Sequence, residues 1–253
     1  MDRLKEQLYE NYLSTHFGSV RAVDPDAFES YARHYRAVFS PLLPAARDAR
    51  IVEVGCGLGH FLHFLKSEGY ANHWGIDIGR EQIDFCRENV TPQVSLVPNT
   101  AAFLDERRGQ YDAIVFLDVL EHLEDDLLLV ILKAAKEALV PGGRVIVSVP
   151  NAACVTALMT RYGDLTHRRL FTEGSLSQLF RTVGFTGVEM LPNEKKVIHS
   201  FRSRPERWLW GLRDRLVRWL LAEFYRHLME GAIPRVQTIN LIGVGRRPER
   251  VGL

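Results

Sequence analysis

A short apolar run followed by three alternating glycines constrains this chain more than any other feature. Residues 51–54 are mostly β-branched, which suits a buried parallel strand, and Gly55, Gly57 and Gly59 follow directly. Glycine has no Cβ, so the turn can be sharp and a ligand can lie against the main chain. The pattern predicts a strand, a glycine turn and a helix at one side of a ligand-binding crevice.

A second strand-like run, residues 74–78, carries Asp77 near its carboxyl end, about 20 residues after the glycines. A carboxylate there can accept hydrogen bonds from both hydroxyls of a ribose, so we expect a nucleoside ligand. A dinucleotide is disfavoured, because His60 stands where the third glycine of Gly-x-Gly-x-x-Gly would lie. Glu53 would repel a diphosphate, and it suits a ligand with a positive charge.

Together with the glycine turn, residues 75–77, 111–118 and 139–147 make the sequence similar to the class I S-adenosylmethionine-dependent methyltransferases. The resemblance extends from residue 50 to about residue 149. It implies S-adenosylmethionine as the cofactor, S-adenosylhomocysteine as the product, and a Rossmann-like α/β fold, doubly wound, with a mostly parallel seven-stranded sheet. The cofactor-binding residues that the resemblance implies are Glu53, Gly55, Cys56, Gly57, Asp77, Ile78, Leu117 and Asp118.

The chain departs from this family after the third predicted strand. The family often has an acid there that meets the adenine amine, whereas this chain has Asn99 and Thr100. One of these two side chains would have to supply the adenine contact.

Further strand-like runs complete the predicted sheet. They lie at about residues 94–97, 113–117, 144–149, 187–191 and 236–244, with helices between the earlier ones. We expect four regions: an N-terminal helical cap (1–46), the cofactor-binding core (47–194), a helical insert (195–235), and the last core strand with a tail (236–253).

The cap carries two sets of aromatic residues. Phe28, Tyr31, Tyr35 and Phe39 have helical spacing and predict a helix that packs on the sheet. A second set could close over the cofactor as a lid, since methyl transfer gains from the exclusion of water. This second set consists of Tyr9, Tyr12, His16 and Phe17.

The composition is that of an ordinary globular enzyme. The 253 residues are 46% hydrophobic and carry a formal charge of +1, so no groove for nucleic acid is expected. No apolar run reaches the roughly 18 residues of a membrane span, and the first residues lack the apolar segment of a signal peptide. Cys56, Cys86 and Cys154 have neither metal nor disulfide spacing. These features predict a cytoplasmic protein.

The insert is basic. Residues 195–235 contain ten Lys or Arg and four acids, an excess of six in a nearly neutral chain. Between Trp208 and Met229 the apolar residues fall along one side of a predicted helix, with Arg213 and Glu223 interrupting that side. Packing on its own domain or homodimerisation is the favoured interpretation. Peripheral contact with the inner face of a membrane is the alternative.

The residues after the fourth predicted strand are candidates for chemistry. Asp118, Glu121 and His122 have a spacing that can place them on one side of a helical turn, and His122 is the first candidate for a general base. A structural hydrogen-bonding role is the plain alternative. The same trio resembles the metal-binding cluster of quinone O-methyltransferases, where a divalent ion would activate the acceptor hydroxyl.

His167 is the second candidate base or sugar-hydroxyl partner. It lies in the run 163–172, before a predicted helix over residues 173–183 that Thr172 would cap. This run resembles methyltransferases of polysaccharide and O-antigen synthesis. A loop histidine satisfied by backbone groups is the alternative.

These observations predict an S-adenosylmethionine-dependent methyltransferase that methylates a hydroxyl of a sugar in a glycan or glycolipid precursor. A quinone-like or other small hydroxylated aromatic is the alternative acceptor. A hypothesis of another class is a non-catalytic S-adenosylmethionine-binding regulator or partner subunit.

Overall fold

The computed structural model describes residues 24–193, 204–228 and 234–249. Its strands are β1 (Ile51–Val54), β2 (His73–Asp77), β3 (Val94–Leu96), β4 (Tyr111–Leu117), β5 (Leu139–Pro150), β6 (Thr186–Asn193) and β7 (Asn240–Arg246). Its α-helices are α3 (Pro25–Val38), α4 (His60–Ser67), α5 (Arg80–Asn89), α6 (Thr100–Asp105), α7 (Asp125–Ala138), α8 (Ala157–Gly163), α9 (Glu173–Val183) and α10 (Arg204–Leu228). Two short 3₁₀ helices, η2 (Ser40–Leu42) and η3 (Leu120–His122), complete the described elements.

The seven described strands form one sheet in the order β3-β2-β1-β4-β5-β7-β6. Neighbouring strands are parallel except at β7, which runs antiparallel to both β5 and β6. Chain connections run outward from β1 toward β3 and then return to β4, so the winding reverses between β1 and β4. The predicted doubly wound, mostly parallel sheet is confirmed, and a ligand crevice is expected at the carboxyl ends of β1 and β4.

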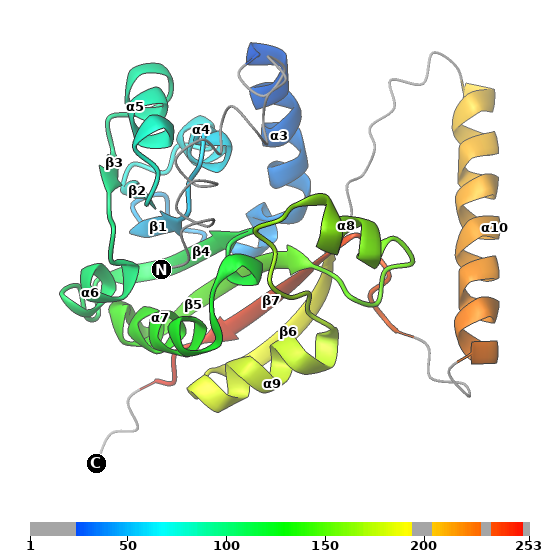
Figure 1. Ribbon diagram of the computed structural model, residues 1–253. Coiled ribbons are helices and arrows are strands. Elements are labelled where there is room, and N and C mark those ends of the chain that lie inside the picture. Colours follow the sequence, from blue (N-terminus) through cyan, green and yellow to red (C-terminus); the bar gives the residue numbers. More distant parts are fainter. Residues whose placement is uncertain (1–23, 194–203, 229–233, 250–253) are drawn as a thin grey trace.

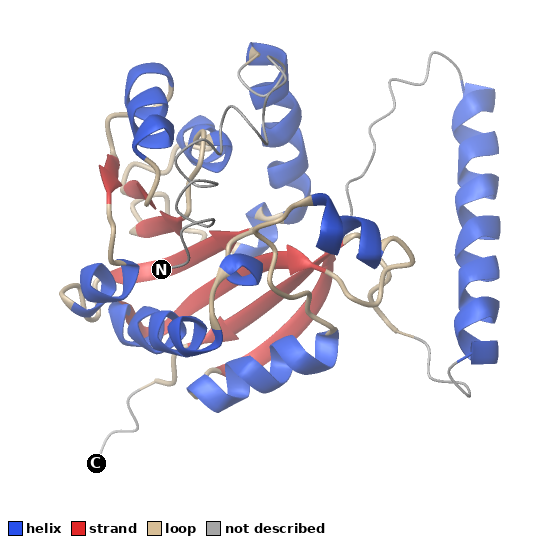
Figure 2. Ribbon diagram, viewed as in Figure 1, coloured by secondary structure: helices blue, strands red, loops and turns tan. Residues whose placement is uncertain are grey.

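Helices cover both faces of the sheet (Figure 1; Figure 2). Side chains alternate along each strand, so Val52 and Phe116 pack with α6, α7 and α9, while Ile51 and Val115 pack with α3, α4 and α5. Because both faces of the central strands are buried, β1 is buried along its whole length. The packing fixes the carboxyl ends of these strands, where the candidate site residues lie.

Three predicted boundaries differ from the observed ones. β5 begins at Leu139, not near residue 144, because Leu139 pairs with Tyr111 on the far side of an irregularity in the ladder. β7 begins at Asn240 and not at 236, since the amide of Val236 binds the Glu173 carboxylate in place of a neighbouring strand. The insert helix begins four residues earlier than predicted.

Other expectations have separate outcomes. The helix over 173–183 is confirmed, and Thr172 caps it with a reciprocal bond from Ser175. The predicted lid residues Tyr9, Tyr12, His16 and Phe17 lie outside the described residues. Within the described ranges, no helix is long and apolar enough to cross a bilayer.

Candidate active site

One cavity of about 520 Å³ opens at the carboxyl ends of β1, β2 and β4, and the glycine turn forms part of its wall. Gly55 has a φ of +74°, and a Cβ built there would lie 2.4 Å from Cγ2 of Val119. Gly59 has a φ of +82°, and its Cβ would lie 2.5 Å from Sγ of Cys86. Both positions require glycine, so the turn is shaped by its own packing as well as by the room it leaves for a ligand.

Asp77 fixes the two loops that border the cavity. Its Oδ2 accepts a hydrogen bond from the amide of Gly57 at 2.9 Å, and its Oδ1 accepts one from the amide of Gly79 at 2.8 Å. Burial raises the pKa of Asp77, and these backbone donors oppose the rise. A carboxylate has about four lone-pair sites, so each oxygen can still accept a ribose hydroxyl.

Glu53 is a buried carboxylate whose hydrogen-bonding capacity is not fully satisfied. The residue is 3% exposed, and its Oε2 atom has no hydrogen-bond partner. Burial, and then the neighbouring Cys86 and Asp77, raise the pKa of Glu53 well above its ordinary value. An isolated buried charge is costly, so this wall of the cavity is suited to a cationic group. The ammonium of S-adenosylmethionine is such a group, so the residues present fit the expected cofactor.

Replacement of Glu53 with glutamine is expected to change how stability depends on pH. Burial raises the folded-state pKa above the ordinary 4.5, so the carboxyl group's contribution to stability is complete below pH 4.5 and is lost as the pH rises through the folded value. The loss is about 1.4 kcal/mol for each pH unit between the two values. In the absence of cofactor, the melting temperature of the Glu53→Gln variant minus that of the wild type should therefore increase as the pH rises. A gap that stays constant with pH would contradict a buried, titrating Glu53.

Aromatic side chains of α3 form a wall beside the glycine turn. Tyr31 and Tyr35 line the cavity, and the ring of His60 lies 4.3 Å from that of Tyr31 and 4.4 Å from that of Phe28, between centroids. Burial raises the pKa of both tyrosines, and the nearby Asp118 carboxylate adds to the rise. The neutral rings help to exclude water from the cavity.

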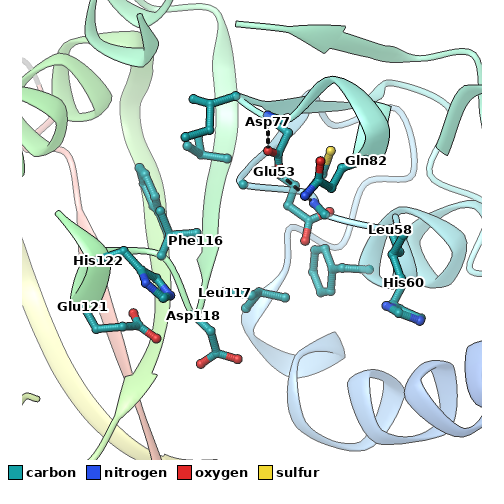
Figure 3. A pocket seen from close by; sticks show the side chains of 18 of the residues that line it. Glu53, Leu58, His60, Asp77, Gln82, Phe116, Leu117, Asp118, Glu121 and His122 are labelled. Carbon is teal, nitrogen blue, oxygen red and sulfur yellow. Dashed lines mark hydrogen bonds between the residues drawn. The ribbon is translucent and has the colours of Figure 1, made fainter. Parts of the chain in front are cut away.

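Most of the predicted cofactor residues line this one cavity. They are Glu53, Gly55, Cys56, Gly57, Asp77, Ile78, Thr100, Leu117 and Asp118. Asn99 is not among the lining residues, because its Oδ1 accepts the amide of Ala102 and so caps α6. Of the two residues expected near the adenine, Thr100 therefore has the position for a direct contact. Figure 3 shows Glu53 and Asp77 on one side of the cavity and Asp118, Glu121 and His122 on the other.

The described residues bring Glu121, His122 and His167 together, with one ligand atom of each within 4.8 Å of the others. The predicted trio contained Asp118 in place of His167, and in this respect the prediction was wrong. Asp118 has a φ of +55°, so the chain turns there, and the helical turn starts only at η3. Asp118 instead accepts a hydrogen bond from Asn240 Nδ2 at 2.6 Å.

Glu121 lies at the centre of this cluster. It is fully buried, and neither carboxylate oxygen has a hydrogen-bond partner. Burial, and then the carboxylates of Asp118 and Asp164, raise the pKa of Glu121 well above its ordinary value. Its Oε1 lies 3.9 Å from Nε2 of His167. The group is therefore suited to stabilise a positive charge on a neighbouring imidazole or a bound cation.

A relay of hydrogen bonds sets the tautomer of His122. Thr166 Oγ1 donates to Asp164 Oδ1 at 2.6 Å, and the same oxygen lies 2.8 Å from His122 Nδ1. The hydroxyl has only one proton, so it must accept from Nδ1 of His122. In the neutral form of His122 the proton is then on Nδ1, and Nε2 is unprotonated.

His167 is fixed in the same tautomer. Its Nδ1 lies 2.8 Å from the carbonyl oxygen of Thr160, which can only accept, so this nitrogen is the donor. The ring centroids of His122 and His167 are 4.7 Å apart. In their neutral forms both imidazoles therefore have an unprotonated Nε2, and that of His167 lies 3.9 Å from a carboxylate oxygen of Glu121 and 3.9 Å from one of Asp164.

Several lining residues were missed by the sequence analysis. They are Gln82, Thr160, Asp164 and Asn240, together with Tyr31 and Tyr35, which had been expected only to pack. The spacing of Asp164-x-Thr166 is typical of a turn in which a side chain accepts the amide two residues on, and this bond is present at 2.8 Å. That local signal was available, whereas nothing in the sequence around Asn240 points to the cavity.

Solved structures resemble this fold over nearly the whole chain. An S-adenosylmethionine-dependent methyltransferase of Archaeoglobus fulgidus covers 94% of this chain and 99% of its own, with a TM-score of 0.64 and 18% identity. Phosphoethanolamine N-methyltransferase 2 of Haemonchus contortus, in complex with S-adenosyl-L-methionine, covers 95% of this chain and 60% of its own, with a TM-score of 0.58 and 13% identity. At these identities the likeness shows the fold.

Relatives with assigned activities are similar over shorter segments. The ubiquinone biosynthesis O-methyltransferase of Shewanella pealeana is 33% identical over 106 residues, which are 40% of this chain and 44% of the relative. The enzyme of the same name from Erwinia tasmaniensis is 27% identical over 167 residues, 64% of each chain. The chain thus spans less than two thirds of the length of these relatives.

The family model of the methyltransferase domain matches residues 27–190, which contain the glycine turn, Asp77 and the Glu121, His122 and His167 cluster. This match covers more than half of the chain, from within α3 to within β6. The chain therefore belongs to the methyltransferase domain family.

Proposed function

We propose that this enzyme methylates the oxygen of a hydroxyl and that His122 or His167 removes the hydroxyl proton. The observation that carries the proposal is the pair of imidazoles beside the buried Glu121, each held through Nδ1 so that its neutral form has an unprotonated Nε2. A hydroxyl must lose its proton when its oxygen is methylated, and a neutral imidazole with a free nitrogen can accept that proton.

The residues on the two sides of the cavity have different roles in the proposed reaction. S-adenosylmethionine supplies a methyl group that its sulfonium already activates. Glu53 and Asp77 would hold the ammonium and the ribose, while Tyr31 and Tyr35 exclude water. Glu121 lies buried beside the imidazoles and stabilises the positive charge that one of them gains with the proton.

For the acceptor we propose a hydroxyl of a sugar in a glycan or glycolipid precursor. Asp118, Thr160, Asp164 and Asn240 line the cavity near the two histidines and offer several hydrogen-bonding groups. A sugar presents several hydroxyls in fixed directions, so it needs such a set of partners. The resemblance of residues 163–172 to methyltransferases of polysaccharide and O-antigen synthesis favours the same acceptor.

Turnover on a panel of acceptors tests this proposal. The purified chain is incubated with S-adenosylmethionine and with nucleotide sugars, lipid-linked oligosaccharides or catechol-like phenols, and methylated products are identified by mass spectrometry. A methyl ether on a sugar oxygen supports the proposal. Methylation of phenols alone would overturn the sugar acceptor, and cofactor binding without turnover on any hydroxyl would overturn O-methylation and favour a regulator.

A quinone-like aromatic is the second candidate acceptor, favoured by the names of the relatives from Shewanella and Erwinia. In this alternative a divalent metal ion would activate the acceptor hydroxyl as a Lewis acid. The donors fit such an ion, since Glu121 has buried oxygens without a hydrogen-bond partner and one ligand atom each of Glu121, His122 and His167 lies within 4.8 Å of the others. The backbone and Thr166 bonds at Nδ1 are the outer contacts that metal-binding histidines usually have.

Chelation separates the metal-free base from the metal site. If the histidines act as bases, treatment with a chelator should leave turnover unchanged, and Co²⁺ added to the protein should give no d–d absorption bands. If a metal is required, activity should fall on chelation and return with a divalent ion, and the Co²⁺ spectrum should disappear in a Glu121→Gln variant. Glu124, which pairs with Arg168 outside the cluster, provides the matched control as Glu124→Gln.

A further inference from the structure

Helix α8 and its flanks expose large apolar side chains next to the catalytic cluster. The exposed fractions lie between 59% and 78% in five residues of an 11-residue stretch: Val155, Leu158, Met159, Tyr162 and Leu165. We call these five residues the α8 rim. Single exposed apolar residues are common on soluble proteins, but five so close together mark an interaction surface.

The α8 rim is joined directly to the catalytic end of the cavity. Thr160, between Met159 and Tyr162 of the rim, binds Nδ1 of His167 through its carbonyl oxygen and is one of the residues that line the cavity. Asp164, which anchors the relay to His122, directly precedes Leu165 of the rim. Whatever covers the rim therefore lies against the segment that orients both histidines.

Helix α10 adds a second exposed surface at the same end of the sheet (Figure 1). Tyr225 donates a hydrogen bond to the carbonyl oxygen of Ala153, which ties α10 to the chain just before α8. Exposed apolar side chains of α10 include Leu216, Trp219, Leu220 and Phe224. Arg213, Arg215 and Arg226 are exposed on the same helix.

We propose that the α8 rim and α10 together form a docking surface for an anionic lipid bilayer. Apolar side chains interleaved with arginine and tryptophan are suited to the boundary between acyl chains and anionic headgroups. The positive charge of this surface argues against a second copy of the chain as its binding partner. Helix α10 contains six Arg and three acidic residues, and this excess of three positive charges would be repeated on both sides of a two-fold interface. The docking surface does not depend on which hydroxyl is methylated.

Sedimentation with lipid vesicles tests the proposal on the full chain. Wild-type protein should bind vesicles of phosphatidylcholine mixed with phosphatidylglycerol, less to phosphatidylcholine alone, and less as salt is raised. A Leu158→Glu/Met159→Glu variant should bind at least about tenfold more weakly, because two apolar side chains are lost from the lipid contact. An Arg215→Glu/Trp219→Ala variant of α10 should also bind more weakly.

The matched control is Leu127→Glu/Val130→Glu, which changes two exposed apolar residues of α7, away from α8 and α10. This control should bind vesicles like the wild type. Retained S-adenosylhomocysteine binding shows that each variant is folded. Absence of wild-type binding to anionic vesicles, or equal loss in the control and the α8 variant, would overturn the proposal. A dimer seen by light scattering and broken by the α8 variant would overturn it in favour of a second copy.

Discussion

Comparison of the His122→Ala and His167→Ala variants is expected to show which of the two histidines is the catalytic base. Loss of the base should lower turnover by about 10²–10⁴, the usual scale of general acid–base catalysis, while affinity for S-adenosylhomocysteine stays near that of the wild type. The affinity should persist because Glu53 and Asp77, which we expect to hold the cofactor, lie on the other side of the cavity (Figure 3). Single-turnover rates and calorimetric titration measure the two quantities. Full activity in both variants with the true acceptor would show that neither histidine is the base.

A Thr166→Val variant examines the relay to His122. Valine cannot accept the Nδ1 proton, so the tautomer of His122 is no longer fixed by this bond. If His122 is the base, this variant should lower kcat and alter the pH–rate profile without removing a group that touches the substrate. Thr156→Val, next to the rim and outside the cavity lining, is the matched control. An unaltered pH profile in Thr166→Val would assign the relay a structural role.

Asp77→Ala is expected to weaken binding of S-adenosylhomocysteine by about 1.5–3 kcal/mol, the cost of losing hydrogen bonds to a charged group. The loss corresponds to roughly tenfold to 150-fold in Kd. Part of it comes from the loops, because the amides of Gly57 and Gly79 also lose their acceptor. Isothermal titration gives the affinity, and thermal unfolding shows whether the variant is folded. Unchanged affinity in a folded variant would contradict the assigned ribose contact.

Asn99→Ala is the matched control for this cofactor prediction. Asn99 caps α6 and does not line the cavity, so its loss should cost about 1 kcal/mol of stability while the affinity stays near that of the wild type. A large loss of affinity in Asn99→Ala would instead return the adenine contact to this residue.

The amino-acid sequence was sufficient to predict that the glycine turn and Asp77 lie at one crevice of the sheet. The strand at residues 51–54, the glycine turn and Asp77 lie within one β-turn-α-β unit, so their relative placement depends on local geometry. The strands of the sheet could also be predicted from local sequence, since each strand carries its own apolar pattern. Glu53 was singled out because it stands two residues before the first glycine of the turn, where a carboxylate suits a ligand with a positive charge.

Only the tertiary structure decided the composition of the Glu121, His122 and His167 cluster. His122 and Thr166 are 44 residues apart in the chain, and Asp118 and Asn240 are 122 apart, so no local pattern joins them. The predicted spacing assumed a regular helix, but the backbone at Asp118 has a positive φ and is not helical. The observed cluster therefore contains His167 and not Asp118. The periodicity of a sequence predicts which residues lie on one face of a single helix or strand, and not which distant segments are in contact. The site is completed by loops that meet because β7 inserts between β5 and β6 and because Thr166 folds back onto η3.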